Sequence, residues 1–155
     1  MPNQPLISET TMSIRIRKRI LVVDDDPDSL AILQVGLAQE GFDASAASDG
    51  FEALWRVRER LPDLIVTDQS MPGMTGIELC SRLRAATKTH DIPMILYTGH
   101  TSDVPGGCFD RVIHKPASLS DITKEIWALL RSGPITEART PPELRPHSPG
   151  PSRRL

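Results

Sequence analysis

The stretch RILVVDDDP, residues 19–27, carries the clearest signal of the fold of this chain. Its apolar run from 20 to 23 is uninterrupted, which is typical of a strand that is buried on both faces of a sheet. Asp26 can then cap a helix that has Pro27 at its first position. Leucines continue at helical spacing until Gly41, which ends the pattern. A doubly buried strand that leads straight into a helix indicates an α/β domain.

The same alternation of strand and helix signals runs through the rest of the chain. A series of this kind predicts one parallel sheet with helices on both faces. The further strands are expected at 42–47, 64–67, 92–97 and 111–114, and the further helices are expected to begin at Ser48, at the capping box of Thr75 with Glu78, and at Ser118.

One connection is too short for the usual helix. Only 16 residues separate Thr98 from Lys115, and they include Pro105, Gly106 and Gly107. A strand needs several of these residues. We therefore expect the fourth helix to be one or two turns at most, or to be replaced by a loop.

The two ends of the chain differ from its middle. Residues 1–17 carry little apolar periodicity, and residues 133–155 are rich in proline. Such segments cannot bury enough apolar surface to offset the entropy lost on ordering. We therefore predict a folded unit at 18–132 between a disordered lead and a disordered tail.

Charge and cysteine content restrict the function classes. The 18 basic and 20 acidic residues give a net charge of -2, which argues against a nucleic-acid-binding module. No secretory signal is visible, and no apolar run is long enough to cross a membrane. The two cysteines, Cys80 and Cys108, lack CxxC spacing. We therefore expect a cytoplasmic protein with reduced, structural thiols and with neither nucleic acid nor a membrane as a partner.

Acidic side chains follow two of the predicted strands. Asp24 and Asp25 follow the first strand, and Asp68 follows the strand 64–67. If the strands are parallel neighbours, these carboxylates meet at one edge of the sheet. Two unit charges about 4 Å apart repel by roughly 4 kcal/mol at an effective dielectric constant of 20, so three carboxylates need a cation. Oxygen ligands at the mouth of a sheet suit Mg²⁺.

The same edge offers groups for phosphoryl transfer. Asp68 stands alone after its strand and opens a glycine-containing loop, so it has room to accept a phosphoryl group as an acyl phosphate. Lys115 would supply a fixed cation and Thr98 a hydroxyl to the phosphoryl oxygens. This short set is chemically sufficient, because phosphoryl transfer needs mostly positioning and charge neutralisation.

Four short motifs occur in order, each after an apolar run: VVDD at 22–25, Asp68 with MPGMTG at 71–76, TG at 98–99 and KP at 115–116. Together they resemble the receiver domain of two-component response regulators over nearly all of residues 19–132. The resemblance implies a doubly wound, five-stranded parallel sheet in the order 2-1-3-4-5, the flavodoxin- and receiver-like arrangement, here with a shortened fourth helix.

The resemblance also implies roles for single residues. Asp68 would be the phosphoacceptor, and Thr98 and Lys115 would contact the phosphoryl group. Asp25, Asp68 and the backbone carbonyl of Ser70 would bind Mg²⁺ directly, and Asp24 would bind it through water. A cis peptide bond is implied between Lys115 and Pro116.

Partners follow from the same resemblance. The phosphodonor would be a phosphohistidine on a sensor histidine kinase or on a histidine phosphotransfer protein, and the output would be an unknown downstream protein in a phosphorelay. The chain would be a stand-alone signalling domain and a phosphoprotein. It would not be an enzyme with turnover, although it would contribute to its own phosphotransfer and dephosphorylation. Ser70 and His100 hold positions that influence the lifetime of the phosphoryl group in the family.

One position departs from the family pattern. Receiver domains usually carry an aromatic residue three positions before the lysine, and here that residue is Val112. The usual relay between threonine and aromatic ring cannot operate in the same way without the ring. A subset of stand-alone regulators resembles this chain in lacking it.

Two other functions compete with this interpretation. Asp24 and Asp26 after an apolar strand also resemble the opening motif of haloacid-dehalogenase-type phosphatases, but the acids those enzymes need after the lysine are missing. A receiver-like interaction domain that works without phosphorylation is the other alternative, and Val112 and the short fourth connection favour it.

Overall fold

The computed structural model describes residues 16–100, 104 and 106–132. The segments 1–15 and 133–155, which cover almost all of the ends predicted to be disordered, lie outside the described residues. None of the helices in the described part of the chain is long and apolar enough to cross a membrane.

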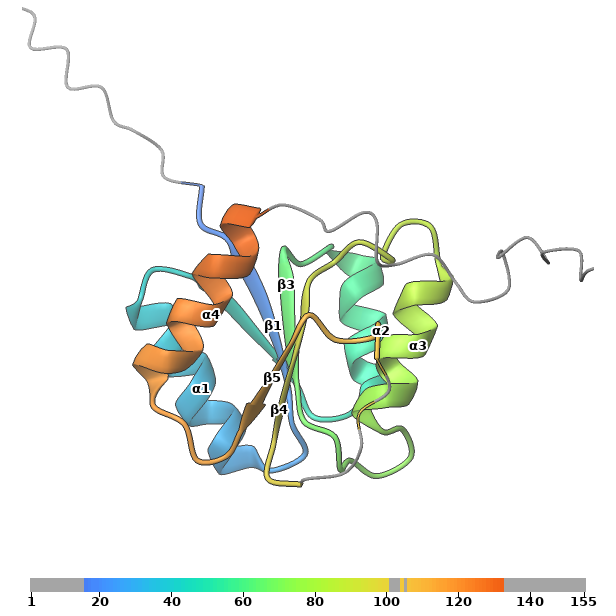
Figure 1. Cartoon of the computed structure of the whole chain (residues 1–155), viewed down its shortest axis with the longest axis horizontal. Helices are drawn as coiled ribbons and strands as arrows, with labels where there is room; N and C mark the ends of the chain where they lie inside the picture. Colours follow the sequence, from blue (N-terminus) through green and yellow to red (C-terminus); the bar gives the residue numbers. More distant parts are fainter. Residues whose placement is uncertain (1–15, 101–103, 105, 133–155) are drawn as a thin grey trace, which may run out of the picture.

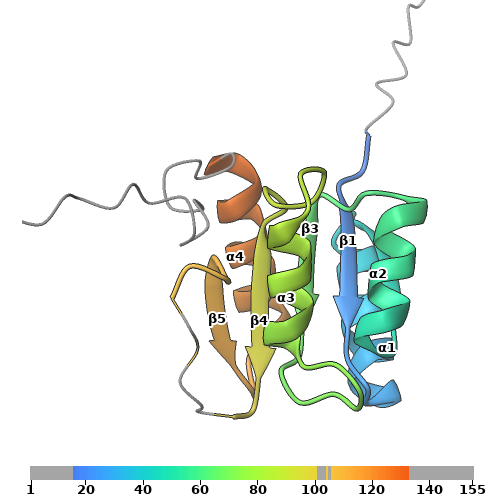
Figure 2. The same ribbon diagram turned by 90° about the vertical axis from the view of Figure 1, so that its right-hand side faces the viewer.

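Five strands form one sheet in the order β2-β1-β3-β4-β5, and all neighbouring pairs are parallel. Figure 2 shows the arrowheads of β1, β4 and β5 pointing the same way. The predicted fold class and strand order are confirmed. The strands are β1 (Arg19–Val23), β2 (Asp43–Ala47), β3 (Leu64–Thr67), β4 (Met94–Thr98) and β5 (Arg111–His114).

Helices cover both faces of the sheet. In Figure 1, α1 and α4 lie on one side, and α2 and α3 lie on the other. The helices are α1 (Pro27–Gln39), α2 (Gly50–Glu59), α3 (Gly76–Ala85) and α4 (Leu119–Ser132).

The alternation of side chains along β1 divides the core into two layers. Leu21 and Val23 pack with the residues of α2 and α3, whereas Ile20 and Val22 pack with those of α1 and α4. All four side chains are at most 2% exposed. This explains the uninterrupted apolar run in the sequence, because a strand covered on both faces has no side chain turned to solvent.

The helix starts were predicted with one error. Asp26 caps α1, with Pro27 in the first turn, and Thr75 and Glu78 form the capping box of α3. The cap of α2 is Asp49 rather than Ser48, because the Asp49 carboxylate reaches the Glu52 backbone N–H at 2.7 Å. Ser48 instead donates its N–H and its hydroxyl to the Glu52 carboxylate, at 2.8 Å each.

The connection from β4 to β5 is as short as expected. Among its described residues, 99–100, 104 and 106–110, there is no helix, and 106–108 form a turn. Gly107 in this turn has a φ of 92°, a value that glycine adopts without strain.

The prediction of two reduced thiols is wrong, because the structure joins Cys80 of α3 to Cys108 of this connection in a disulfide. The sequence separation of 28 residues concealed the pairing. Only the fold brings the middle of α3 against the turn that precedes β5. The Cα atoms lie 6.1 Å apart, within the usual range for a disulfide.

Candidate functional site

Three carboxylates meet where β1 and β3 end. Val23 and Thr67 are register partners in these neighbouring strands, so the residues that follow them leave the sheet side by side. One carboxylate oxygen each of Asp24, Asp25 and Asp68 lies within 4.8 Å of the other two. The predicted convergence of these side chains is therefore present in the structure.

Asp24 is the most enclosed of the three acids. Its side chain is nearly buried, and its Oδ1 accepts the backbone N–H of Asp26 at 3.0 Å. Its Oδ2 accepts a hydrogen bond from Lys115 Nζ at 2.8 Å. Asp25 is exposed and Asp68 is half-buried. The three carboxylates therefore differ in exposure: Asp24 is buried and paired, Asp68 is half-buried, and Asp25 is open to solvent.

Lys115 reaches this cluster from the end of β5. Its backbone N–H donates to Thr98 O at 2.9 Å, and its Nζ lies 3.8 Å from Asp68 Oδ2 as well as 2.8 Å from Asp24. Burial alone would lower the pKa of Lys115. The hydrogen bond and the charge of Asp24, with the charge of Asp68, outweigh burial and raise this pKa. The ammonium is therefore a permanent positive charge at the site.

The loop after Asp68 is closed by its own hydrogen bonds. Gln69 donates its N–H to Asp68 Oδ1 at 2.7 Å and accepts the N–H of Gly76 at its carbonyl, at 3.0 Å. The side chain of Gln69 accepts the N–H of Ile77 at 3.0 Å. A Cβ at position 76 would collide with the Asp68 carbonyl, so glycine is required at this close approach. Ser70 lies exposed in this loop.

Thr98 ends β4 beside these groups and is 1% exposed. Its hydroxyl oxygen accepts the backbone N–H of His100 at 3.2 Å, and His100 itself is exposed. The peptide bond between Lys115 and Pro116 is cis, as the family resemblance implied. The sheet thus brings the ends of β1, β3, β4 and β5 to one edge.

Asp26 does not belong to the cluster. Its carboxylate caps α1, where it accepts the N–H of Ser29 at 3.3 Å and the Ser29 hydroxyl at 2.6 Å. These hydrogen bonds, led by the one from the hydroxyl, lower the pKa of Asp26. Of the three consecutive acids, the first two turn to the site and the third stabilises the helix.

The donor set fits a divalent cation. Carboxylate oxygens from two strands lie close enough to share one ion, and oxygen is the ligand that Mg²⁺ prefers. The Lys115 ammonium neutralises part of the negative charge of the cluster through its contact with Asp24. The predicted carbonyl ligand, Ser70, lies in the adjoining loop.

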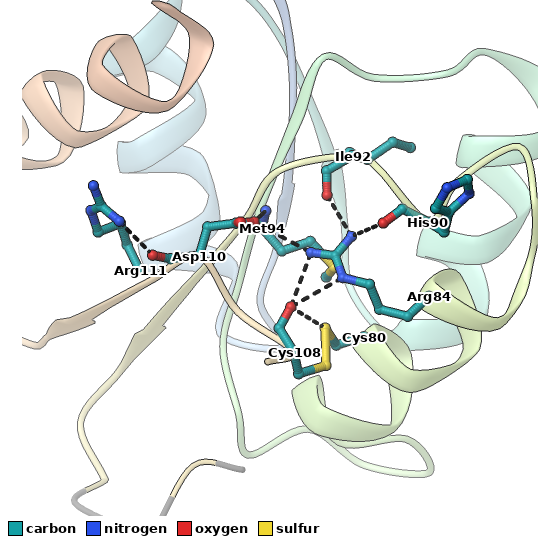
Figure 3. A network of polar contacts seen from close by, with 8 residues as sticks. All are labelled: Cys80, Arg84, His90, Ile92, Met94, Cys108, Asp110 and Arg111. Atoms are coloured by element: carbon teal, nitrogen blue, oxygen red, sulfur yellow. Dashed lines mark hydrogen bonds and ion pairs between the residues drawn. A yellow bond between two sulfur atoms is a disulfide. The ribbon is translucent and has the colours of Figure 1, made fainter. Parts of the chain in front are cut away.

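A second polar network was not predicted, although it lies directly beside the disulfide. Figure 3 shows the Arg84 guanidinium at its centre. Arg84 donates to the carbonyls of His90, Ile92 and Cys108 at 2.7–3.2 Å, and it pairs with Asp110 at 3.3 Å. An arginine in the last turn of an amphipathic helix looks like a solvated residue, so no sequence signal distinguishes it.

Comparison with known families decides the assignment. The family model described as the response regulator receiver domain matches residues 20–126. The chain belongs to the response regulator receiver family. The matched segment runs from the second residue of β1 into α4, so the acidic edge described above lies within the receiver.

Curated relatives of this receiver are longer proteins. The chain is 39% identical over 122 residues to the DNA-binding response regulator MtrA of Mycolicibacterium smegmatis, covering 75% of this chain and 52% of that protein. It is 38% identical over 119 residues to the phosphate regulon transcriptional regulatory protein PhoB of Rhizobium meliloti, covering 73% of this chain and 52% of PhoB. The chain thus spans about half the length of the curated relatives it matches.

Solved structures share the fold. The response regulator TrrA of Thermotoga maritima, in complex with Mg²⁺ and BeF, superposes with a TM-score of 0.66 at 32% identity, over 72% of this chain and 97% of that one. The chemotaxis response regulator CheY4 of Vibrio cholerae gives a TM-score of 0.66 at 25% identity, over 72% of this chain and 98% of CheY4.

The expectation that nucleic acid plays no part is wrong in the light of these relatives, several of which are named as DNA-binding or transcriptional regulators. The prediction failed because it rested on net charge. The net charge of this chain describes only the half that it shares with these relatives. It says nothing about whether the other half of a relative binds DNA.

Val112 is one of the exposed residues of the edge strand β5. It lies three positions before Lys115, where the family resemblance implied an aromatic residue, and it is 40% exposed. Its register partner on β4 is Leu96. The side chain at this position is therefore small and faces solvent.

Proposed function

We propose that this receiver accepts a phosphoryl group on Asp68 in a Mg²⁺-dependent reaction and passes the signal on within a two-component phosphorelay. The observation that supports it most is the convergence of Asp24, Asp25 and Asp68 with the Lys115 ammonium. A half-buried carboxylate next to a fixed cation, at the open edge of a sheet, suits nucleophilic attack on phosphorus.

Each residue has a distinct task in this reaction. An Asp68 carboxylate oxygen attacks the phosphorus of a phosphohistidine, an O–P bond forms, and the N–P bond to the donor breaks. Lys115 Nζ lies 3.8 Å from Asp68, so a small rotation away from Asp24 brings it to the transferred phosphoryl oxygens. The Thr98 hydroxyl, at the end of the neighbouring strand, would donate to another phosphoryl oxygen.

The carboxylates of Asp24, Asp25 and Asp68, with the Ser70 carbonyl, would hold the metal ion. Bound Mg²⁺ supplies positive charge that neutralises the phosphoryl oxygens as the group is transferred. The related TrrA was solved in complex with Mg²⁺ and BeF, which supports a cation at this edge of the fold. Without the ion, Lys115 is the charge that keeps the cluster together.

The donor in this proposal is a cytoplasmic sensor histidine kinase or a histidine phosphotransfer protein. The phosphorylated receiver passes the signal on by contact with another protein surface. The relatives named as DNA-binding regulators favour a surface that itself binds DNA, outside the receiver described here.

Intact-mass measurement tests the proposal. The wild-type protein and Asp68→Asn are incubated with acetyl phosphate in the presence of Mg²⁺ or of a chelator. We expect one added phosphoryl group on wild type with Mg²⁺ only. An unmodified wild type, or modification of Asp68→Asn to the same extent, would contradict the proposal.

The same preparation separates the two alternatives. A phosphatase would turn over a phosphate ester steadily, losing activity with Asp26→Ala and keeping it with Asp68→Ala. The position of Asp26 at the cap of α1 speaks against that outcome. An interaction domain that works without phosphorylation would bind its partner equally well as wild type and as Asp68→Asn.

A further inference from the structure

The disulfide joins two parts of the receiver that have different roles. Cys80 lies in α3 and is 0% exposed, whereas Cys108 is half-buried in the segment 106–110, which precedes β5. We call 106–110 the tethered segment. Figure 3 shows the bond closing this segment onto α3. β5 begins at Arg111, directly after it.

We propose that Cys80 and Cys108 form a reversible thiol–disulfide switch that controls how firmly β5, and with it Lys115, is held at the phosphorylation site. The link to Lys115 rests on the proposed function. The redox behaviour itself rests on the disulfide and its surroundings alone.

The geometry connects the tethered segment to the site through an edge strand. β5 has four residues, mostly exposed, and is the edge strand next to β4 in the described sheet. It is anchored at its start by Asp110, which donates its N–H to Met94 O at 2.9 Å and accepts the N–H of Met94 at 2.8 Å. At its other end β5 leads into Lys115. A short exposed edge strand depends on such anchors for its placement.

The surroundings of the sulfur atoms suit both redox states. Arg84 holds the Cys108 carbonyl through two hydrogen bonds, at 3.0 and 3.2 Å, and neither involves sulfur. The Cys80 sulfur lies 3.0 Å from the same carbonyl oxygen, so a Cys80 thiol formed by reduction has an acceptor in place. Reduction would therefore remove the covalent tie without leaving a buried polar group unpaired.

The chemistry is exchange with a dithiol reductant. A reductant thiolate attacks the sulfur of Cys108, the less buried of the two residues, forms a mixed disulfide and expels Cys80 as a thiolate, which takes a proton from water. The second thiol of the reductant then displaces Cys108, which is protonated in turn. The two cysteines gain two electrons and two protons, and the reductant becomes a disulfide. Disulfides in reducing compartments are commonly transient or redox-sensing, which fits a signalling domain.

The first part of the test counts thiols and follows amide exchange. Full-length protein purified without reductant is alkylated with iodoacetamide before and after dithiothreitol, and hydrogen exchange is measured on both forms. We expect no alkylation before reduction and two alkylated cysteines after it. We expect the amide of Asp110 to exchange roughly tenfold faster, or more, in the reduced form.

Cys108→Ser is the matched variant, because it removes the bond at the half-buried position and leaves Cys80 in place. It should show the fast exchange with and without dithiothreitol. Full alkylation of unreduced wild type, or equal exchange in its two forms, would overturn the switch.

The second part measures the consequence at the site. Reduced wild type and Cys108→Ser should take up a phosphoryl group from acetyl phosphate about threefold more slowly, or worse, than oxidised wild type, because Lys115 is less well placed. Equal rates would overturn the link to Lys115. If no form is phosphorylated, the proposed function fails, while thiol counting and exchange still decide the redox switch.

Discussion

Lys115 donates a 2.8 Å hydrogen bond to Asp24, a residue 91 positions earlier in the chain. The two residues follow strands that are not neighbours in the sheet, since β3 and β4 lie between β1 and β5. A long side chain at the end of β5 is thus needed to reach the buried carboxylate at the end of β1. This contact neutralises the most enclosed acid of the cluster and ties the edge strand to the site.

Replacing Lys115 should separate metal binding from phosphoryl transfer. In Lys115→Met the ammonium no longer competes for Asp24, so calorimetry should show tighter Mg²⁺ binding. Phosphoryl uptake from acetyl phosphate should slow by about tenfold or more, because the fixed cation at the transferred group is lost. The free energy of unfolding without Mg²⁺ should fall by about 1–2 kcal/mol, because Asp24 is left without its partner.

Lys124→Met is the control for that experiment. Its side chain is 74% exposed on α4, and its ammonium lies 3.9 Å from Asp121. Metal affinity and phosphoryl uptake should equal those of wild type. Parallel losses in both variants would show that the effect of Lys115→Met is not local.

The pKa of Lys115 predicts the pH dependence of stability. Burial would lower this pKa, but Asp24 and Asp68 raise it above the ordinary 10.5. A group whose pKa is raised by folding contributes stability that is complete below the unfolded value and is lost as pH rises through the folded value. Urea unfolding should therefore show this contribution intact up to 10.5 and declining above it.

The same pKa can be observed directly. NMR titration of the Lys115 side chain should give a lower pKa in Asp24→Asn than in wild type, since the neutral amide removes the strongest acidic partner. An unchanged titration in Asp24→Asn would contradict the contact.

Gly76 should be the least replaceable glycine near the site. A Cβ at this position would meet the Asp68 carbonyl and the Gln69 backbone. Gly76→Ala should therefore lower the free energy of unfolding by about 1–3 kcal/mol and reduce phosphoryl uptake, because the loop after β3 must move. At Gly106 no atom of the described residues, its chain neighbours aside, lies within 4 Å of an added Cβ, so Gly106→Ala should change stability by less than about 0.5 kcal/mol. Chemical denaturation of both variants checks this difference.

Arg84 should stabilise the domain far more than its neighbour Arg82. Arg84→Met would leave several carbonyl groups and the 8% exposed Asp110 side chain without the guanidinium. We expect a loss of about 2–4 kcal/mol in the free energy of unfolding. The Arg82 guanidinium lies over the ring of Phe51, 6.0 Å from its centroid, and Arg82→Met should cost less than about 1 kcal/mol. Similar losses in the two variants would contradict the role given to the network.

The fold was predictable because its signals are local and agree with one another. The apolar run before Asp24, the cap at Asp26 and the capping box of Thr75 each specify an element through neighbouring residues. The error at the start of α2 has the same origin. Ser48 and Asp49 are both good capping residues. Which of them caps α2 depends on the contacts of Glu52, whose backbone N–H binds Asp49 and whose carboxylate binds Ser48.

The sequence was enough to predict which side chains stand at the ends of which strands at the site. The pairing of Lys115 with Asp24 rather than Asp68 was not, because it depends on side-chain distances of 2.8 and 3.8 Å. The Cys80–Cys108 disulfide and the Arg84 network were missed for a related reason. Both depend on how the short connection before β5 lies against α3, and no periodic pattern encodes that placement.

Locating the phosphoryl group within the chain distinguishes Asp68 from the other aspartates as the phosphoacceptor. Wild-type protein treated with acetyl phosphate and Mg²⁺ is reduced with borohydride, which converts an aspartyl phosphate into homoserine, and is then mapped by peptide mass spectrometry. The account predicts homoserine at position 68 and at no other aspartate. Homoserine at Asp24, Asp25 or Asp26, or none at all, would contradict it.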